Sequence, residues 1–193
     1  MANTLNSLTT GSGGVQIACV DTSGDLNIQS GGSTKIAVTS AGVAVTGLSK
    51  ASLPTGSVLQ VVSATYSTQT STTSASYVDT GLTATITPTS ATSKIFAVIS
   101  MPNSERNGAV NCMLYLNLCR NGSQIVEAVK AIGYSGGSTG DFVFSTGFNY
   151  YDSPASTSAL TYKVQFYTYA GNGTVTVQAN SGASVLTLME IAA

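Results

Sequence analysis

The feature that most constrains the fold is a succession of short apolar runs separated by Gly, Pro, Ser and Thr. Between Leu53 and Met101 three such runs follow one another, at residues 58–62, 77–86 and 95–99. They are rich in β-branched residues, and turn residues bound each of them. Such runs indicate β-strands, and no part of the sequence has a convincing 3.6-residue period, which a surface helix would need. The sequence therefore predicts an all-β fold.

The same pattern continues to the C-terminus. Residues 110–119 alternate between apolar and mixed positions, and Asn121-Gly122 then supplies the pair of positive-φ residues that a type I′ hairpin needs. Further strands are expected at residues 125–132, 142–148, 160–167, 175–177 and 185–191. The last strand is apolar on both faces, which places it centrally or at a subunit contact. About eight strands at this spacing predict a jelly-roll-like antiparallel β-sandwich over residues 51–193.

Residues 1–50 read differently, as an N-terminal extension of short β repeats or a shaft-like segment. Its apolar runs lie at residues 15–20, 25–29, 35–39 and 43–46. Each run offers about two large aliphatic groups, whose burial contributes roughly 1.5–3 kcal/mol apiece. Ordering each residue costs roughly 1–2 kcal/mol. We therefore expect a single copy not to stay folded unaided, and we interpret the extension as an assembly or anchoring segment that packs on the following domain or pools its apolar faces with other copies.

Charge excludes several classes of function. Only 8% of the 193 residues are charged and the net charge is −1, whereas an average globular protein has roughly 25% charged residues. The absence of a basic patch argues against nucleic-acid binding. No apolar segment reaches the roughly 18 residues that a transmembrane helix needs, so membrane insertion is not expected. The N-terminus lacks the pattern of a secretory signal, which favours assembly in a cytoplasm.

The residues that usually carry catalysis are scarce. The sequence has no His, which removes the commonest general base and any Ser-His-Asp triad. Cys112 and Cys119 are expected on opposite faces of one strand, and we interpret all three cysteines, with Cys19, as buried free thiols. Asp141 and Asp152 could form a glycosidase-like pair, but solvated loop caps are the preferred interpretation. We predict no catalytic residue, no cofactor and no metal site.

Three segments read as exposed loops that could contact a partner or a sugar: Asn103–Gly108, Tyr134–Gly140 and Tyr150–Ser158. The glycine-rich part of the second is interpreted as a flexible loop, because it lacks the Lys and the helix of a phosphate-binding loop. Aromatic rings stack on sugars and their hydroxyls form hydrogen bonds, so a glycan platform is one hypothesis for the tyrosines; packing on strand faces is the preferred one. The tyrosines considered are Tyr150, Tyr151, Tyr162, Tyr167 and Tyr169.

The run LPTGSVLQVV at residues 53–62, followed by YVDTGLTATITP at 77–88 and SKI at 93–95, resembles the C-terminal domain of tailed-phage virion proteins of the tail fibre or capsid decoration type, notably from phages of cyanobacteria. Residues 152–154 and 186–191 look similar as well, and residues 11–48 are similar to fibre-shaft sequence. The resemblance implies a homotrimeric, non-enzymatic virion protein whose partners are the major capsid protein or other virion proteins.

The resemblance leaves three functions to weigh. The first is a capsid decoration, or cement, protein on the phage head, assembled in the host cytoplasm. The alternative is a short tail fibre or adhesin that binds a host surface glycan. A polysaccharide depolymerase is a third, different class.

Overall fold

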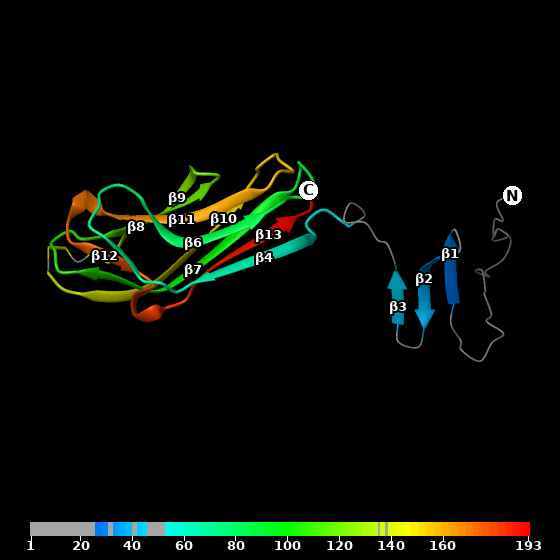
Figure 1. The fold of residues 1–193 in the computed structure, drawn as a ribbon, viewed down its shortest axis with the longest axis horizontal. Coiled ribbons are helices and arrows are strands. Elements are labelled where there is room, and N and C mark those ends of the chain that lie inside the picture. The colour runs from blue at the N-terminus through cyan, green and yellow to red at the C-terminus, as the bar shows by residue number, and fades with distance from the viewer. Residues whose placement is uncertain (1–25, 31–32, 40–41, 46–52, 135, 138) are drawn as a thin grey trace. The chain divides into compact units, whose positions relative to one another are not determined.

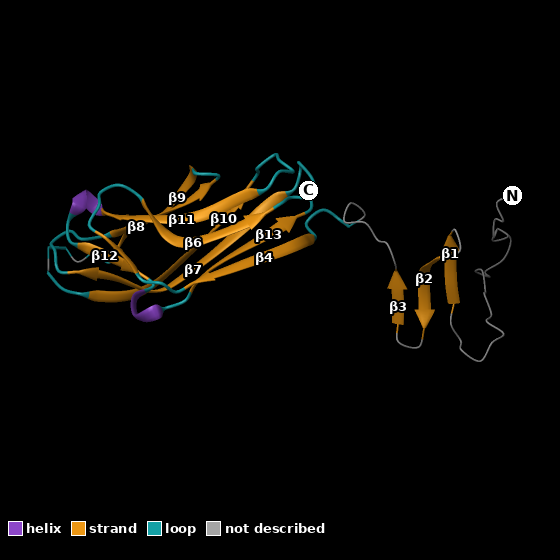
Figure 2. Ribbon diagram, viewed as in Figure 1, coloured by secondary structure: helices purple, strands orange, loops and turns teal. Residues whose placement is uncertain are grey.

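A computed structural model describes residues 26–30, 33–39, 42–45, 53–134, 136–137 and 139–193 (Figure 1). The chain divides into two compact units, Met1–Ser52 and Leu53–Ala193. The described residues are mostly strands, with two short 3₁₀ turns, η2 (Tyr169–Gly171) and η3 (Ala179–Ser181) (Figure 2).

The second unit is a sandwich of two antiparallel sheets. Four strands pair in the order β4-β13-β7-β10, and four more in the order β6-β11-β8-β9. This is the strand order of a jelly roll, so the predicted jelly-roll-like sandwich is confirmed. The strands are β4 (Val58–Tyr66), β6 (Val78–Ile86), β7 (Lys94–Asn107), β8 (Leu114–Arg120), β9 (Ser123–Ile132), β10 (Phe142–Asp152), β11 (Leu160–Thr168) and β13 (Ser184–Ile191). We call the two sheets the β4 sheet and the β6 sheet.

The core lies between the two sheets and follows from the period of two in each strand. In β6 every second residue from Leu82 to Ile86 is buried, and in β11 every second residue from Leu160 to Thr168. The largest fully buried side chains include Tyr162 and Phe166 of β11. Burial of this inner layer is the main stabilising term for such a sandwich.

Several local predictions are confirmed. Strand β13 lies between β4 and β7, the central position that its apolar faces indicated. Asn121 and Gly122, with φ values of 50° and 84°, form the two-residue turn that joins β8 to β9. Cys112 and Cys119 are both buried free thiols, but Cys112 lies before β8 and not in one strand with Cys119. Cys19 lies outside the described residues.

Two boundaries differ from expectation. Strand β8 begins at Leu114 rather than at Val110, because Asn111 has a left-handed φ of 60° and the Cys112 N–H closes a turn on the Ala109 carbonyl at 3.2 Å. The Ser/Thr-rich segment after β4 contains a short strand, β5 (Thr70–Thr72), which pairs with β12 (Thr174–Val177). These two strands extend the β4 sheet beside the far end of β7.

The expected exposed loop at Asn103–Gly108 is wrong, because β7 continues through Asn107. Arg106 is fully buried, and its guanidinium lies 4.8 Å from the centroid of the Phe142 ring. It donates hydrogen bonds to the carbonyls of Ala109 (3.1 Å) and Cys112 (3.3 Å). Arg106, which the sequence alone placed in solvent, is thus a buried side chain that stabilises the end of β7.

In the first unit, β1 (Leu26–Ser30), β2 (Ser33–Thr39) and β3 (Gly42–Val45) form an antiparallel meander. The runs expected at 25–29, 35–39 and 43–46 are thus strands, while the run at 15–20 lies outside the described residues. Ile28 pairs with Ile36 and Ile36 with Val45, so the three form one row across the sheet. Ile28 is 48% exposed and Val45 is 50% exposed. An aliphatic row therefore remains accessible on this small sheet.

Candidate functional site

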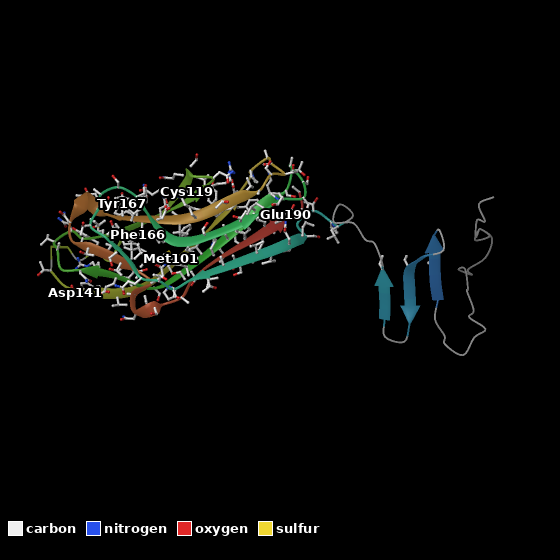
Figure 3. All side chains as sticks on the ribbon, in the orientation of Figure 1. Met101, Cys119, Asp141, Phe166, Tyr167 and Glu190 are labelled. Carbon is white, nitrogen blue, oxygen red and sulfur yellow. The ribbon has the colours of Figure 1, made fainter. Side chains whose placement is uncertain are left out.

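The segments expected to form one binding surface lie at opposite ends of the sandwich. Tyr134–Gly140 precedes β10. The segment expected as a loop at Tyr150–Ser158 begins inside β10, which ends at Asp152, and its remaining residues follow the strand. Strand β10 has 11 residues, so at about 3.3 Å per residue these segments are roughly 33 Å apart. Figure 3 shows the same separation, with Asp141 at one end and Glu190 at the other. They do not form a single surface.

This separation also excludes a glycosidase-like pair formed by Asp141 and Asp152. Asp141 is exposed at the start of β10, and Asp152 ends the same strand. Asp152 is not the solvated cap that was expected: it is buried, its carboxylate lies 2.6 Å from the Arg120 guanidinium, and the Tyr162 hydroxyl donates to it at 2.6 Å. It joins β10 of the β4 sheet to β8 and β11 of the β6 sheet.

The five tyrosines proposed as a platform are also dispersed. Tyr162 is in the core, and Tyr150 packs partly buried against it. Tyr151 is 54% exposed and lies beside Phe96, with ring centroids 6.4 Å apart, on the β4 sheet. Only Tyr167 and Tyr169 share a surface, so the five do not form a platform. The preferred interpretation, packing on strand faces, holds for Tyr150 and Tyr162.

A different set of rings gathers around those two. Tyr77, Tyr115, Tyr167 and Tyr169 form what we call the tyrosine cluster, at one end of the β6 sheet (Figure 3 labels Tyr167). Tyr167 lies 4.6 Å from Tyr77 at 76° and 4.7 Å from Tyr115 at 32°, and Tyr115 lies 6.0 Å from Tyr169 at 21°. Tyr115 therefore contacts a second ring, Tyr167, at a tilt and a third, Tyr169, as a stacked pair.

Strand register explains the tyrosine cluster. Tyr115 of β8 and Tyr167 of β11 are directly paired, and Phe166 pairs with Val78, which brings the preceding Tyr77 alongside. Sequence reasoning missed Tyr77 and Tyr115. The alternation along residues 110–119 already put Tyr115 on the face opposite Leu114 and Leu116, but nothing in a single strand shows which strand will be its neighbour.

The cluster is tied to one ion pair. The Tyr77 hydroxyl donates to Glu127 Oε1 at 2.8 Å, and Glu127 pairs with Lys130 at 2.5 Å. Burial, with Glu127 nearby, raises the pKa of Tyr77 and of Tyr167, whereas Lys130 and then the Tyr77 hydroxyl lower the pKa of Glu127. The phenols therefore stay neutral and the carboxylate charged near neutral pH, an arrangement suited to stacking and hydrogen bonding rather than to proton transfer.

Beside the tyrosine cluster lies an open hollow of about 460 Å³. Its lining carries no charged side chain and consists of Asn111, Met113, Tyr115, Ala131, Tyr134 and Tyr169. Tyr134, 59% exposed, also lines a second, smaller hollow of about 230 Å³ formed with Phe142 and Phe144. The larger hollow is open, so a ligand bound there would keep one side in contact with water.

A polar row continues along the β6 sheet away from the rings. Asp79 pairs with Lys163 at 2.8 Å and accepts a hydrogen bond from Gln165 at 2.6 Å, and the Cys119 thiol donates to Gln165 at 3.0 Å. Lys163 lowers the pKa of Asp79, and burial raises the pKa of Cys119. A protonated, buried thiol is a poor nucleophile, so this row offers polar contacts and no evident chemistry.

Two further properties concern the described part of the chain only. Within it, no group of three His, Cys, Asp or Glu side chains is arranged to hold a metal ion. Within it, too, no helix has the length and apolar character to cross a membrane.

No family model matches the sequence, and no curated protein matches it either. Among solved structures, a chain from T=1 particles derived from infectious bursal virus is similar at a TM-score of 0.38 and 16% identity, covering 70% of this chain and 37% of that one. A chain of the T13 infectious bursal disease virus particle gives 0.37 and 14%, covering 83% and 43%. This chain thus spans less than half of theirs. At such values the likeness assigns neither fold nor function, and the jelly roll rests on the strand order above.

Proposed function

We propose that this protein is a non-enzymatic structural protein of a phage virion, a homotrimer that decorates or cements the head surface. The observation that carries the proposal is the accessible aliphatic row of the N-terminal sheet. The resemblance of residues 53–95 to tailed-phage virion proteins supports it, as does the scarcity of charge. Ser, Thr and Asn surfaces can be covered in a dense assembly without burying charge.

The row calls for a partner on physical grounds. The strands of the meander have 5, 7 and 4 residues, which is too little for independent stability without a covered apolar face. Ile28 and Val45 leave about half of their surface accessible, at 48% and 50%. Sister copies related by closed symmetry, or a capsid subunit, would cover such a row. We assign the anchoring role to residues 1–50 and the projecting role to residues 51–193.

A short tail fibre or adhesin that binds a host surface glycan is the alternative, and the tyrosine cluster with its hollow favours it. The chain enters the sandwich at the end where Glu190 lies, because the Gly56 N–H donates to the Ala192 carbonyl at 2.8 Å. Figure 3 places Tyr167, and with it the tyrosine cluster, at the opposite end. Copy number separates the two functions: hundreds of chains per particle mean decoration, and a few per tail mean a fibre. A depolymerase would be recognised by release of reducing ends from host polysaccharide.

The test is removal of the anchoring segment. A variant lacking residues 1–48 should keep a cooperatively unfolding sandwich, lose co-sedimentation with phage heads and become monomeric by light scattering. The double substitution Ile28→Asn and Val45→Asn should weaken both properties in the full chain, because it puts amides into the aliphatic row.

Val61→Asn is the matched control, since Val61 is 56% exposed on β4 and lies outside that row. Head binding and self-association that survive the deletion would contradict the proposal. A full chain that is monomeric at micromolar concentration, with residues 1–48 protected from protease, would do so as well.

A further inference from the structure

We propose that the hollow beside the tyrosine cluster is a binding site for a neutral oligosaccharide. This inference rests on the alternative function, glycan binding at the tyrosine cluster, and names the class of glycan. It does not depend on the attachment role, because none of the residues that line the hollow belongs to the segment removed in the attachment test. A pyranose ring has a face of C–H groups and a rim of hydroxyls, and it needs a site that matches both.

The aromatic side of the hollow matches the C–H face. Tyr115 and Tyr169 both line it as a stacked pair, with ring centroids 6.0 Å apart and planes 21° from parallel. Tyr169 is 45% exposed and Tyr134 is 59% exposed. Rings of this kind bring large contact areas at a low entropy cost, and their hydroxyls can bond to a wet ligand.

The polar groups of the hollow match a rim of hydroxyls. Asn111 contributes an amide that can both donate and accept, and the tyrosines contribute hydroxyls. Asn111 and Ala131 both hold left-handed backbone angles, with φ of 60° and 59°. Asn adopts such an angle readily, and at Asn111 it belongs to the turn that precedes β8.

Charge selects a neutral ligand. No charged side chain lines the hollow, and the neighbouring Lys130 and Glu127 form an ion pair with each other at 2.5 Å. A sulfated, phosphorylated or acidic glycan would leave its charge without a partner in this site. A peptide with apolar anchors would suit the smaller hollow at Phe142 and Phe144 better.

The experiment uses the full chain and immobilised neutral oligosaccharides of glucose, galactose, mannose and N-acetylglucosamine, followed by calorimetry with the strongest binder. We expect Tyr169→Ala and Tyr134→Ala each to weaken binding about tenfold by removing one ring contact. Tyr169→Phe should keep most of the affinity. Tyr151→Ala, which removes an exposed ring from the other sheet, is the control and should bind like the wild type.

Because the altered side chains are largely exposed, thermal unfolding of each variant should stay near that of the wild type, which separates loss of binding from loss of fold. Binding should also be insensitive to ionic strength. Failure to bind any of the neutral oligosaccharides would overturn the proposal. So would unchanged affinity in both alanine variants, or a preference for acidic glycans that salt abolishes.

Discussion

At the scale of single residues, Glu190 shows how this weakly charged protein uses a buried charge. Its carboxylate is fully buried at the end of β13 and accepts bonds from the Thr89 N–H (2.6 Å), the Thr89 hydroxyl (2.7 Å) and Gln60 Nε2 (2.6 Å). Burial disfavours the charged form, but the hydrogen bonds outweigh it, and the pKa of Glu190 is lowered from its ordinary 4.5. One side chain thus holds the turn between β6 and β7 against β4.

This carboxylate should make stability depend on acid. Because the folded pKa of Glu190 lies below the unfolded value of 4.5, its contribution is fully present above that pH and is lost as the pH falls through the folded pKa. Glu190→Gln should lower the free energy of unfolding at pH 7 by about 1–3 kcal/mol, because the new amide faces the Gln60 donor. Urea unfolding at pH 7 and pH 3 would measure this, and the deficit should shrink at pH 3.

Asp141→Asn, at an exposed position on the opposite end, is the control and should change the free energy of unfolding at pH 7 by little. A Glu190→Gln deficit that is equally large at both pH values would show that shape, not charge, is what matters there.

Gly81 offers a second test at this scale. It lies in β6 with a φ of 86°, and a Cβ there would lie 2.2 Å from the Tyr66 ring. Gly122 has nearly the same φ, 84°, but open space around it. Gly81→Ala should therefore cost more than Gly122→Ala, about 2–4 kcal/mol against about 1–2 kcal/mol, because Tyr66 must also move. Chemical denaturation of both variants gives the comparison, and equal costs would mean that Tyr66 moves aside freely.

At the scale of elements, the sandwich is held by more than its apolar core. Asp152 at the end of β10 connects across the core to Arg120 at the end of β8 and to Tyr162 of β11. The two sheets are thus tied by a charged contact at the same end as Glu190. The exposed pair of Asp79 and Lys163 has similar geometry but lies within one sheet, with the Asp79 side chain 57% exposed.

The two ion pairs should contribute differently to the free energy of unfolding. Asp152→Ala leaves a guanidinium and a phenol without their acceptor, and we expect a loss of about 3–5 kcal/mol. Asp79→Ala should cost about 0–1 kcal/mol, since water already competes for that pair. Thermal or urea unfolding of the two variants side by side measures the contrast. Similar losses would mean that Arg120 finds another acceptor once Asp152 is gone.

At the scale of the whole molecule, the sequence was informative wherever one strand decides the outcome. Alternation placed the inward residues of β8, and the doubly apolar β13 was placed at the centre of its sheet. What a lone sequence could not supply was contact between distant segments. Arg106 looked exposed because its cover, Phe142, is in another strand, and Tyr77 joined Tyr167 only through the register of β6 and β11. The five-tyrosine platform failed for the same reason.

The place where the chain joins the sandwich has a mechanical consequence. The first strand of the domain, β4, runs antiparallel to the last, β13, in eight paired positions, and Ala192 bonds to Gly56 and Ser57 beside the junction. If the domain were held at residue 53 and pulled through a ligand at its opposite end, the force would act along the paired strands β4 and β13. The hydrogen bonds between β4 and β13 would then be loaded in shear and would resist together, instead of breaking one after another.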